Sequence, residues 1–138
     1  MNGSFNSPRA PEPVGAYPHA LRAGDLLFLS GVGPRERGKK EIPGVELDES
    51  GNIVSYDIEA QCRSVFQNVR YILEDAGLSW ENIVDVTVFL TNMKDDFDAY
   101  NRLYAEYFKD NKPCRTTVEV NALPTPIAIE IKVIATIE

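Results

Sequence analysis

The most regular hydrophobic pattern in the chain lies between residues 57 and 77. Apolar residues recur there at intervals of three and four, which places them on one face of an α-helix. They are Ile58, Cys62, Val65, Phe66, Val69, Ile72, Leu73 and Ala76. Asp57 is suited to cap the start of this helix and Gly77 to cap its end.

Short apolar runs rich in β-branched residues predict the strands. They cover residues 19–22, 26–30, 45–47, 53–54, 83–90, 115–120 and 127–137. A second helix is predicted to open at Asp95 or Asp96, and we expect its aromatic face to lie in the core. That face carries Phe97, Tyr100, Tyr104 and Phe108. The order of elements, two strands and a small hairpin followed by α-β-α-β-β, predicts an α+β fold.

The last predicted strand has two different faces. One face is wholly apolar and should pack under the helices; it consists of Ile127, Ile129, Ile131 and Val133. The other face carries Ala128, Glu130, Lys132 and Ile134. This second face is too polar for a closed core and too apolar for open water, so it predicts an oligomer interface.

A change in composition near residue 14 divides the chain into a tail and one domain. Residues 1–13 are rich in Gly, Ser and Pro and bury little, so we predict a flexible N-terminal tail. Residues 14–138 are predicted to form a single domain, because 138 residues bury one core but not two. Within this domain, residues 35–40 form a basic loop that we expect to be exposed.

Charge and cysteine content exclude several classes of function. The formal charge of −7 repels phosphate backbones and anionic membrane surfaces, so we expect neither nucleic acid nor membrane as a partner. There is no apolar run of about 20 residues and no secretory leader pattern, which favours a cytoplasmic location. The single histidine and the absence of a C-x-x-C motif argue against a metal site, a Ser-His-Asp triad or a disulfide framework.

One constellation of residues suggests chemistry. Arg115 and Thr117 point the same way on their strand, and a turn near residues 124–126 would bring Glu130 of the next strand alongside. Arginine can bind a substrate carboxylate with two hydrogen bonds, and a partly desolvated glutamate can activate a water molecule. A purely structural ion pair across the two strands is the alternative.

Several blocks of the sequence together resemble the reactive-intermediate deaminase family, also called Rid or YjgF. The most specific block is Pro113-Cys114-Arg115-Thr116-Thr117-Val118, followed by Leu123-Pro124 and Ile129-Glu130-Ile131. Further blocks are Gly15-Ala16-Tyr17, Leu27-Phe28-Leu29-Ser30-Gly31, Val86-Thr87-Val88-Phe89-Leu90 and Tyr100-Asn101. The resemblance extends from Val14 to Ile137.

The resemblance implies a chorismate-mutase-like α+β fold, a mixed sheet backed by two helices, assembled as a homotrimer with clefts between subunits. It implies that Arg115 anchors the substrate carboxylate and that Glu130 positions the hydrolytic water. Tyr17, Gly31 and Thr117 would line the same cleft. The implied reaction is hydrolysis of a 2-imino acid or its enamine tautomer to a 2-oxo acid and ammonia, without metal or organic cofactor.

Two departures from the common family pattern indicate a subgroup. The chain has Tyr17-Pro18-His19-Ala20 where many members have Tyr-Ser-Gln-Ala, and it inserts the basic loop after Gly31. These features resemble the 2-aminomuconate deaminases of tryptophan (kynurenine) and aminophenol degradation, which form 2-oxohex-3-enedioate. Their substrate is a dicarboxylate, so His19, Arg35 or Arg37 is predicted to bind the second carboxylate.

Three alternatives remain from the sequence. The first is a broad deaminase of 2-iminopropanoate and 2-iminobutanoate. The second is a non-catalytic trimer that binds a small ligand, although the presence of Arg115 together with Glu130 argues for catalysis. The third, an endoribonuclease, is least favoured because the chain is acidic and shows no basic, aromatic groove.

Overall fold

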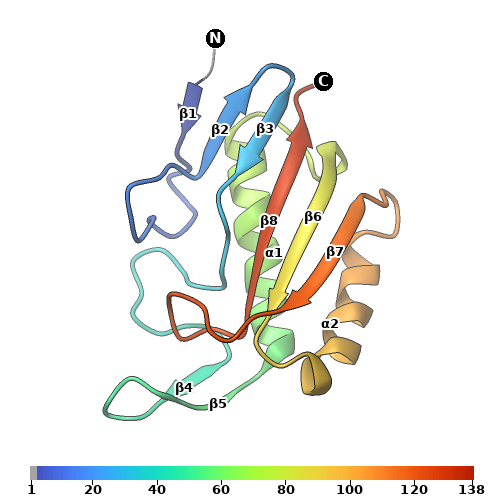
Figure 1. Cartoon of the computed structure of the whole chain (residues 1–138). Coiled ribbons are helices and arrows are strands. Elements are labelled where there is room, and N and C mark those ends of the chain that lie inside the picture. Colours follow the sequence, from blue (N-terminus) through green and yellow to red (C-terminus); the bar gives the residue numbers. More distant parts are fainter. Residues whose placement is uncertain (1–2) are drawn as a thin grey trace.

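A computed structural model describes residues 3–138. Its strands are β1 (Gly3–Phe5), β2 (Ala20–Ala23), β3 (Leu26–Leu29), β4 (Val45–Leu47), β5 (Ile53–Tyr56), β6 (Ile83–Leu90), β7 (Cys114–Glu119) and β8 (Ile129–Thr136). Its helices are α1 (Ile58–Asp75) and α2 (Met93–Tyr107), with a short 3₁₀ turn, η1, at Trp80–Asn82. Both long helices lie behind one six-stranded sheet, and β4 and β5 form a separate hairpin (Figure 1).

The sheet is mixed, as the resemblance implies. Its strand order is β1-β2-β3-β8-β6-β7. All neighbours are antiparallel except β6 and β7, which run parallel because α2 connects them as a crossover. β7 is therefore an edge strand, two strands away from its neighbour in sequence, β8.

The ends of the helices follow their capping residues. Asp57 accepts hydrogen bonds from the backbone N–H of residues 59 and 60, so α1 begins as predicted. Gly77 follows the end of α1 with φ of 84°, a conformation in which glycine is strongly favoured. The predicted start of α2 is wrong by two to three residues, because the Asn92 side chain accepts from the Asp95 N–H (3.1 Å) and caps the helix earlier.

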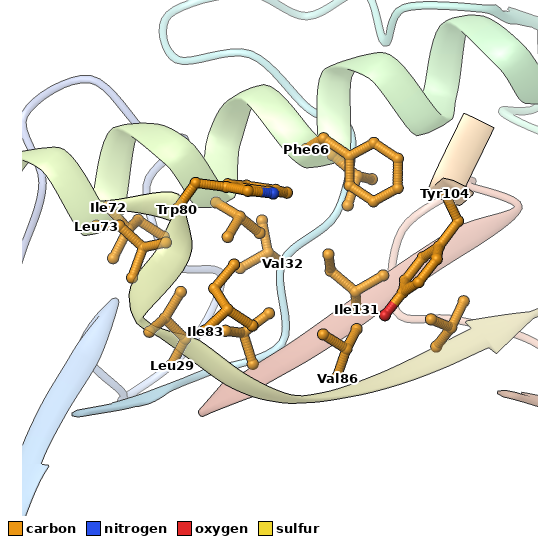
Figure 2. Packing of buried hydrophobic residues seen from close by; sticks show 14 of the residues in the cluster. Leu29, Val32, Phe66, Ile72, Leu73, Trp80, Ile83, Val86, Tyr104 and Ile131 are labelled. Carbon is orange, nitrogen blue, oxygen red and sulfur yellow. The ribbon is translucent and has the colours of Figure 1, made fainter. Parts of the chain in front are cut away.

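The core lies between the helices and the sheet. Aliphatic residues of the central strands, among them Val86 and Ile131, face Phe66 of α1 and Tyr104 of α2 (Figure 2). The rings of Tyr104 and Phe108 stack at 4.4 Å between centroids. The prediction that the aromatic face of the second helix is part of the core is confirmed for its buried members, which are Tyr100, Tyr104 and Phe108.

The N-terminal segment corrects the prediction of a flexible tail over residues 1–13. Residues 1–2 lie outside the described part, but residues 3–13 form a strap along the sheet and α1, in which β1 pairs with β2. Ser7 and Ala10 are buried, and Arg9 binds Asp75 of α1 at 2.6 Å. The tail prediction failed because these contacts use single polar side chains and backbone groups, which leave no hydrophobic pattern in the sequence.

The other side of the sheet is not covered by either helix, and we call it the open face. Strand register and alternation place on it Leu21, Phe28, Phe89, Val118, Glu130 and Ile134. Leu21 and Val118 are exposed although they are apolar. This mixture of apolar and charged residues is the pattern that the sequence predicts for the last strand. Within residues 3–138, no helix has the length and apolar character needed to span a membrane.

Candidate active site

The residues predicted to form one site fall into two groups. Tyr17, His19, Gly31 and Arg35 line a cavity of about 30 Å³ between the strap and the segment after β3, roughly the space of two water molecules. Glu130 of β8 borders this group, because its carboxylate lies against Gly31. Arg115 and Thr117 are instead on the edge strand β7.

The predicted juxtaposition of Arg115 and Glu130 is wrong within one chain. β6 lies between their strands, and Arg115 pairs with Val86 whereas Glu130 pairs with Phe89. Val86 is buried beneath the helices, so Arg115 is on the helix side of the sheet and Glu130 is on the open face. A structural ion pair between Arg115 and Glu130 is excluded by the same register.

Glu130 has the properties of a carboxylate available for chemistry. It is half-buried, and this burial raises the pKa of its carboxyl group. Among the hydrogen bonds and ion pairs of residues 3–138, none involves its carboxylate; the neighbouring cation Lys132 donates to the Leu29 carbonyl at 2.8 Å. A Cβ on Gly31 would lie 2.5 Å from Glu130 Oε2, so a larger residue at this position would require the carboxylate to move.

Arg115 extends over the side of α2. Its Nη1 donates to Asn101 Oδ1 at 2.7 Å, and its guanidinium carbon lies 4.7 Å from the centroid of the Tyr104 ring. Thr117, two residues along the same face, shares a 3.0 Å hydrogen bond with the hydroxyl of buried Tyr100. Arg115 is exposed, and the remaining N–H groups of its fork are available for a carboxylate.

His19 is occupied within the chain. The Ser7 N–H donates to His19 Nδ1 at 2.8 Å, so Nε2 carries the ring proton and donates to the Pro11 carbonyl at 2.7 Å. The side chain is buried. The structure therefore does not support His19 as a ligand for a substrate carboxylate; it fastens the strap.

The basic loop also binds the strap. Arg35 Nη2 donates to the Glu12 carbonyl at 2.9 Å, and Arg37 Nε donates to the Ala10 carbonyl at 2.7 Å. Arg37 also pairs with the Glu12 carboxylate at 2.9 Å. The prediction of a wholly exposed loop is wrong for these two arginines, which are both partly buried. Of the two, only Arg35 lines the cavity beside Tyr17 and Gly31.

Sequence analysis missed two residues at this site. Asn101 and Tyr104, which contact Arg115, were assigned only to the helix and its core face. Their spacing of three places them on one side of α2, and this was the available signal. Within residues 3–138, no group of three or more His, Cys, Asp or Glu side chains is arranged to hold a metal ion.

Comparisons with known proteins agree with this architecture. The family model described as Endoribonuclease L-PSP matches residues 7–137. RutC family protein PH0854 of Pyrococcus horikoshii is 42% identical over 126 residues, which are 91% of this chain and 90% of that protein. Reactive Intermediate Deaminase A of Arabidopsis thaliana, a chloroplastic protein, is 36% identical over 94% of this chain and 63% of its own length.

Solved structures give the same result for the fold. The YjgF gene product from E. coli superposes with a TM-score of 0.83 at 31% identity and covers 99% of both chains. E. coli TdcF with bound serine also has a TM-score of 0.83 at 31% identity, over 97% of this chain and 98% of that one. These matches confirm the predicted α+β fold, with a mixed sheet and two helices. The chain belongs to the Rid/YjgF family, which includes the RutC and L-PSP proteins.

Proposed function

We propose that this protein is a cofactor-independent deaminase that hydrolyses small 2-imino acids, or their enamine tautomers, to 2-oxo acids and ammonia. The observation that carries the proposal is the Glu130 carboxylate, which is half-buried against Gly31 and forms no ion pair with any residue between 3 and 138. A carboxylate in that environment can take a proton from a water molecule. The relationship to a reactive intermediate deaminase supports the reaction class.

The proposed chemistry needs a correctly oriented substrate and a group that accepts and returns protons. Arg115 binds the substrate carboxylate, which holds the imine carbon near the water on Glu130. Water adds to the carbon of the protonated imine while Glu130 accepts one proton from the water, which gives a neutral carbinolamine. Glu130 returns this proton to the amine nitrogen, and the C–N bond then breaks. Ammonia leaves as the carbinolamine hydroxyl gives its proton to Glu130 and the carbonyl forms.

A single chain does not bring Arg115 and Glu130 to one substrate, because they are on opposite sides of the sheet. We therefore propose that a neighbouring copy supplies one of the two residues, in the predicted homotrimer. The open face is suited to be the interface, since it exposes apolar side chains such as Leu21 and Val118.

The dicarboxylate 2-aminomuconate is the second candidate substrate. One observation favours it: Arg35 lines the cavity with Tyr17 and Gly31 and donates one hydrogen bond to the strap, so part of its fork is available for a second carboxylate. His19 and Arg37 offer less, because both are occupied by the strap. A monocarboxylic imino acid needs only Arg115, so it is the first candidate.

The experiment compares 2-iminobutanoate and 2-aminomuconate, each generated enzymatically in situ, by the rate of ammonia release. We expect Arg115→Ala and Glu130→Gln to abolish turnover. Two variants serve as matched controls. Arg102→Ala removes a different arginine, which lies on α2, and Lys132→Gln removes the positive charge next to Glu130 on β8. Both controls should retain activity.

The outcomes separate the candidates. Faster turnover of 2-aminomuconate, lost in Arg35→Ala, would identify the dicarboxylate as the substrate. Binding of a 2-oxo acid that depends on Arg115, with no turnover of either substrate, would refute the enzyme and favour a ligand-binding trimer. Activity that survives in both Arg115→Ala and Glu130→Gln would refute the proposed site.

Subunit mixing tests the shared site directly. The inactive variants Arg115→Ala and Glu130→Gln are unfolded together and refolded in equal amounts. If one copy supplies Arg115 and another supplies Glu130, about a quarter of the sites regain both residues and activity returns. No recovery in a refolded mixed trimer would show that both residues act from the same copy.

A further inference from the structure

We infer that Asn101 and Tyr104 are positioning residues that hold the guanidinium of Arg115 in the orientation that receives the substrate carboxylate. This inference rests on the proposed function. It adds two residues from α2 to a site otherwise formed by strands and the strap.

The geometry restrains Arg115 from two directions. Asn101 Oδ1 accepts a 2.7 Å hydrogen bond from Nη1, which fixes one arm of the fork. The rings of Tyr104 and Tyr100 lie 4.7 and 5.5 Å from the guanidinium carbon, within the range of cation–π contacts. Arg115 is exposed on an edge strand, where an unrestrained arginine would lose considerable rotamer entropy on binding a ligand.

The hydrogen-bond partner of Arg115 leaves its positive charge unneutralised. Within residues 3–138, Arg9, Arg37 and Arg102 each pair with a carboxylate. The side-chain partner of Arg115 is instead the neutral amide of Asn101. An amide orients the guanidinium without neutralising it, so its full positive charge stays available for an anionic ligand.

Tyr104 is a rigid support for the second contact. Its ring stacks on Phe108 at 4.4 Å between centroids, and it also packs against Phe66. Its hydroxyl is buried and has no hydrogen-bond partner within residues 3–138, so the ring alone serves Arg115. Tyr104→Phe therefore keeps the contact, whereas Tyr104→Leu removes it.

The test measures KM and kcat for 2-iminobutanoate and the Kd of 2-oxobutanoate by calorimetry. We expect Asn101→Asp to raise KM and Kd about tenfold, because its carboxylate competes with the ligand for Arg115, while kcat changes little. Asn101→Ala and Tyr104→Leu should raise both constants by a smaller factor. Tyr104→Phe should leave them unchanged.

An NMR measurement of the Arg115 side chain separates positioning from general damage. Nitrogen-15 labelling should show slow rotation and a distinct Nε–H signal for Arg115 in the wild type and in Tyr104→Phe, but averaged signals in Asn101→Ala. KM and Kd within twofold of wild type in both Asn101→Asp and Asn101→Ala would overturn the inference, provided that Arg115→Ala loses binding.

Failure of the proposed function has a different signature. If Arg115→Ala itself leaves turnover and 2-oxobutanoate binding intact, the carboxylate-binding role assigned to Arg115 is wrong. An averaged Arg115 signal in the wild type would instead overturn the positioning inference alone, whatever the activity.

Discussion

The buried hydroxyl of Tyr104 makes the clearest stability prediction. This hydroxyl is inaccessible to solvent and has no hydrogen-bond partner in residues 3–138. Its ring, in contrast, packs in the aromatic cluster of the core (Figure 2). We expect Tyr104→Phe to stabilise the fold, because it removes an unpaired polar group and keeps the packed ring.

The expected gain is about 1 kcal/mol. Burying a hydroxyl without a partner costs about 1–3 kcal/mol, and the small void left by its removal costs roughly 0.3 kcal/mol. For 138 residues the entropy of unfolding is about 0.3 kcal/mol per kelvin. The melting temperature should therefore rise by about 3 °C or more.

Tyr100→Phe is the matched control. Tyr100 is fully buried on the same helix, but its hydroxyl is bonded to Thr117 Oγ1 at 3.0 Å. Removing a satisfied hydroxyl should lower the free energy of unfolding by about 1 kcal/mol. The two variants delete the same atom type one helical turn apart, and we predict opposite signs.

Urea unfolding and thermal melts at equal protein concentration measure both variants. A spectrophotometric alkaline titration adds an independent check, because burial raises the pKa of Tyr104 to about 12. The titration of Tyr104→Phe should show one fewer tyrosine with a raised pKa than the titration of the wild type. A melting temperature that falls in Tyr104→Phe as it does in Tyr100→Phe would mean that the Tyr104 hydroxyl is satisfied, and would refute the argument.

Three further variants test the site and the strap. Gly31→Ala should fold but lose most turnover, because the new Cβ would lie 2.5 Å from Glu130 Oε2 and displace the carboxylate; unchanged kcat would contradict this. His19→Ala should speed hydrogen exchange in residues 3–13, since both hydrogen bonds between its ring and the strap are lost; equal protection would exclude the fastening role. Glu130→Gln should stabilise the fold at neutral pH, because the raised pKa means that folding disfavours the ionised carboxylate. The gain in stability of Glu130→Gln over the wild type should shrink as the pH falls toward about 4, where the carboxyl group is protonated in the unfolded state as well. A stability difference that does not change with pH would contradict this prediction.

The elements that could be predicted from the sequence are those held together by hydrophobic periodicity. α1 repeats apolar residues over five turns, and β6 and β8 are long strands that each have one continuous apolar face, so their type and place follow from local pattern. The strap has no such pattern. It is held by the buried histidine ring and by arginine side chains bonded to backbone carbonyls, contacts that join residues far apart in the sequence.

The structure brings some of the predicted site residues together and separates others. Tyr17, Gly31 and Arg35 do come together at one cavity. The structure does not support the expected role of His19. The sequence shows that a histidine is present, but it does not show that backbone groups of the strap already bind both ring nitrogens. Asn101 could be recognised as a site residue only from the side of α2 that faces the edge strand β7, which the sequence alone does not show.

The separation of Arg115 from Glu130 follows from the connectivity of the sheet. Two strands joined by a short segment are usually neighbours, which is why an adjacent pair was expected. Here α2 forces β7 to run parallel to β6 at the edge, and the segment after β7 must pass the end of β6 to reach β8. The cation and the carboxylate thus remain unpaired within one chain, which avoids the internal ion pair that would neutralise both. In the shared site that we propose, a substrate carboxylate would bind Arg115 of one copy and a water molecule would bind Glu130 of another.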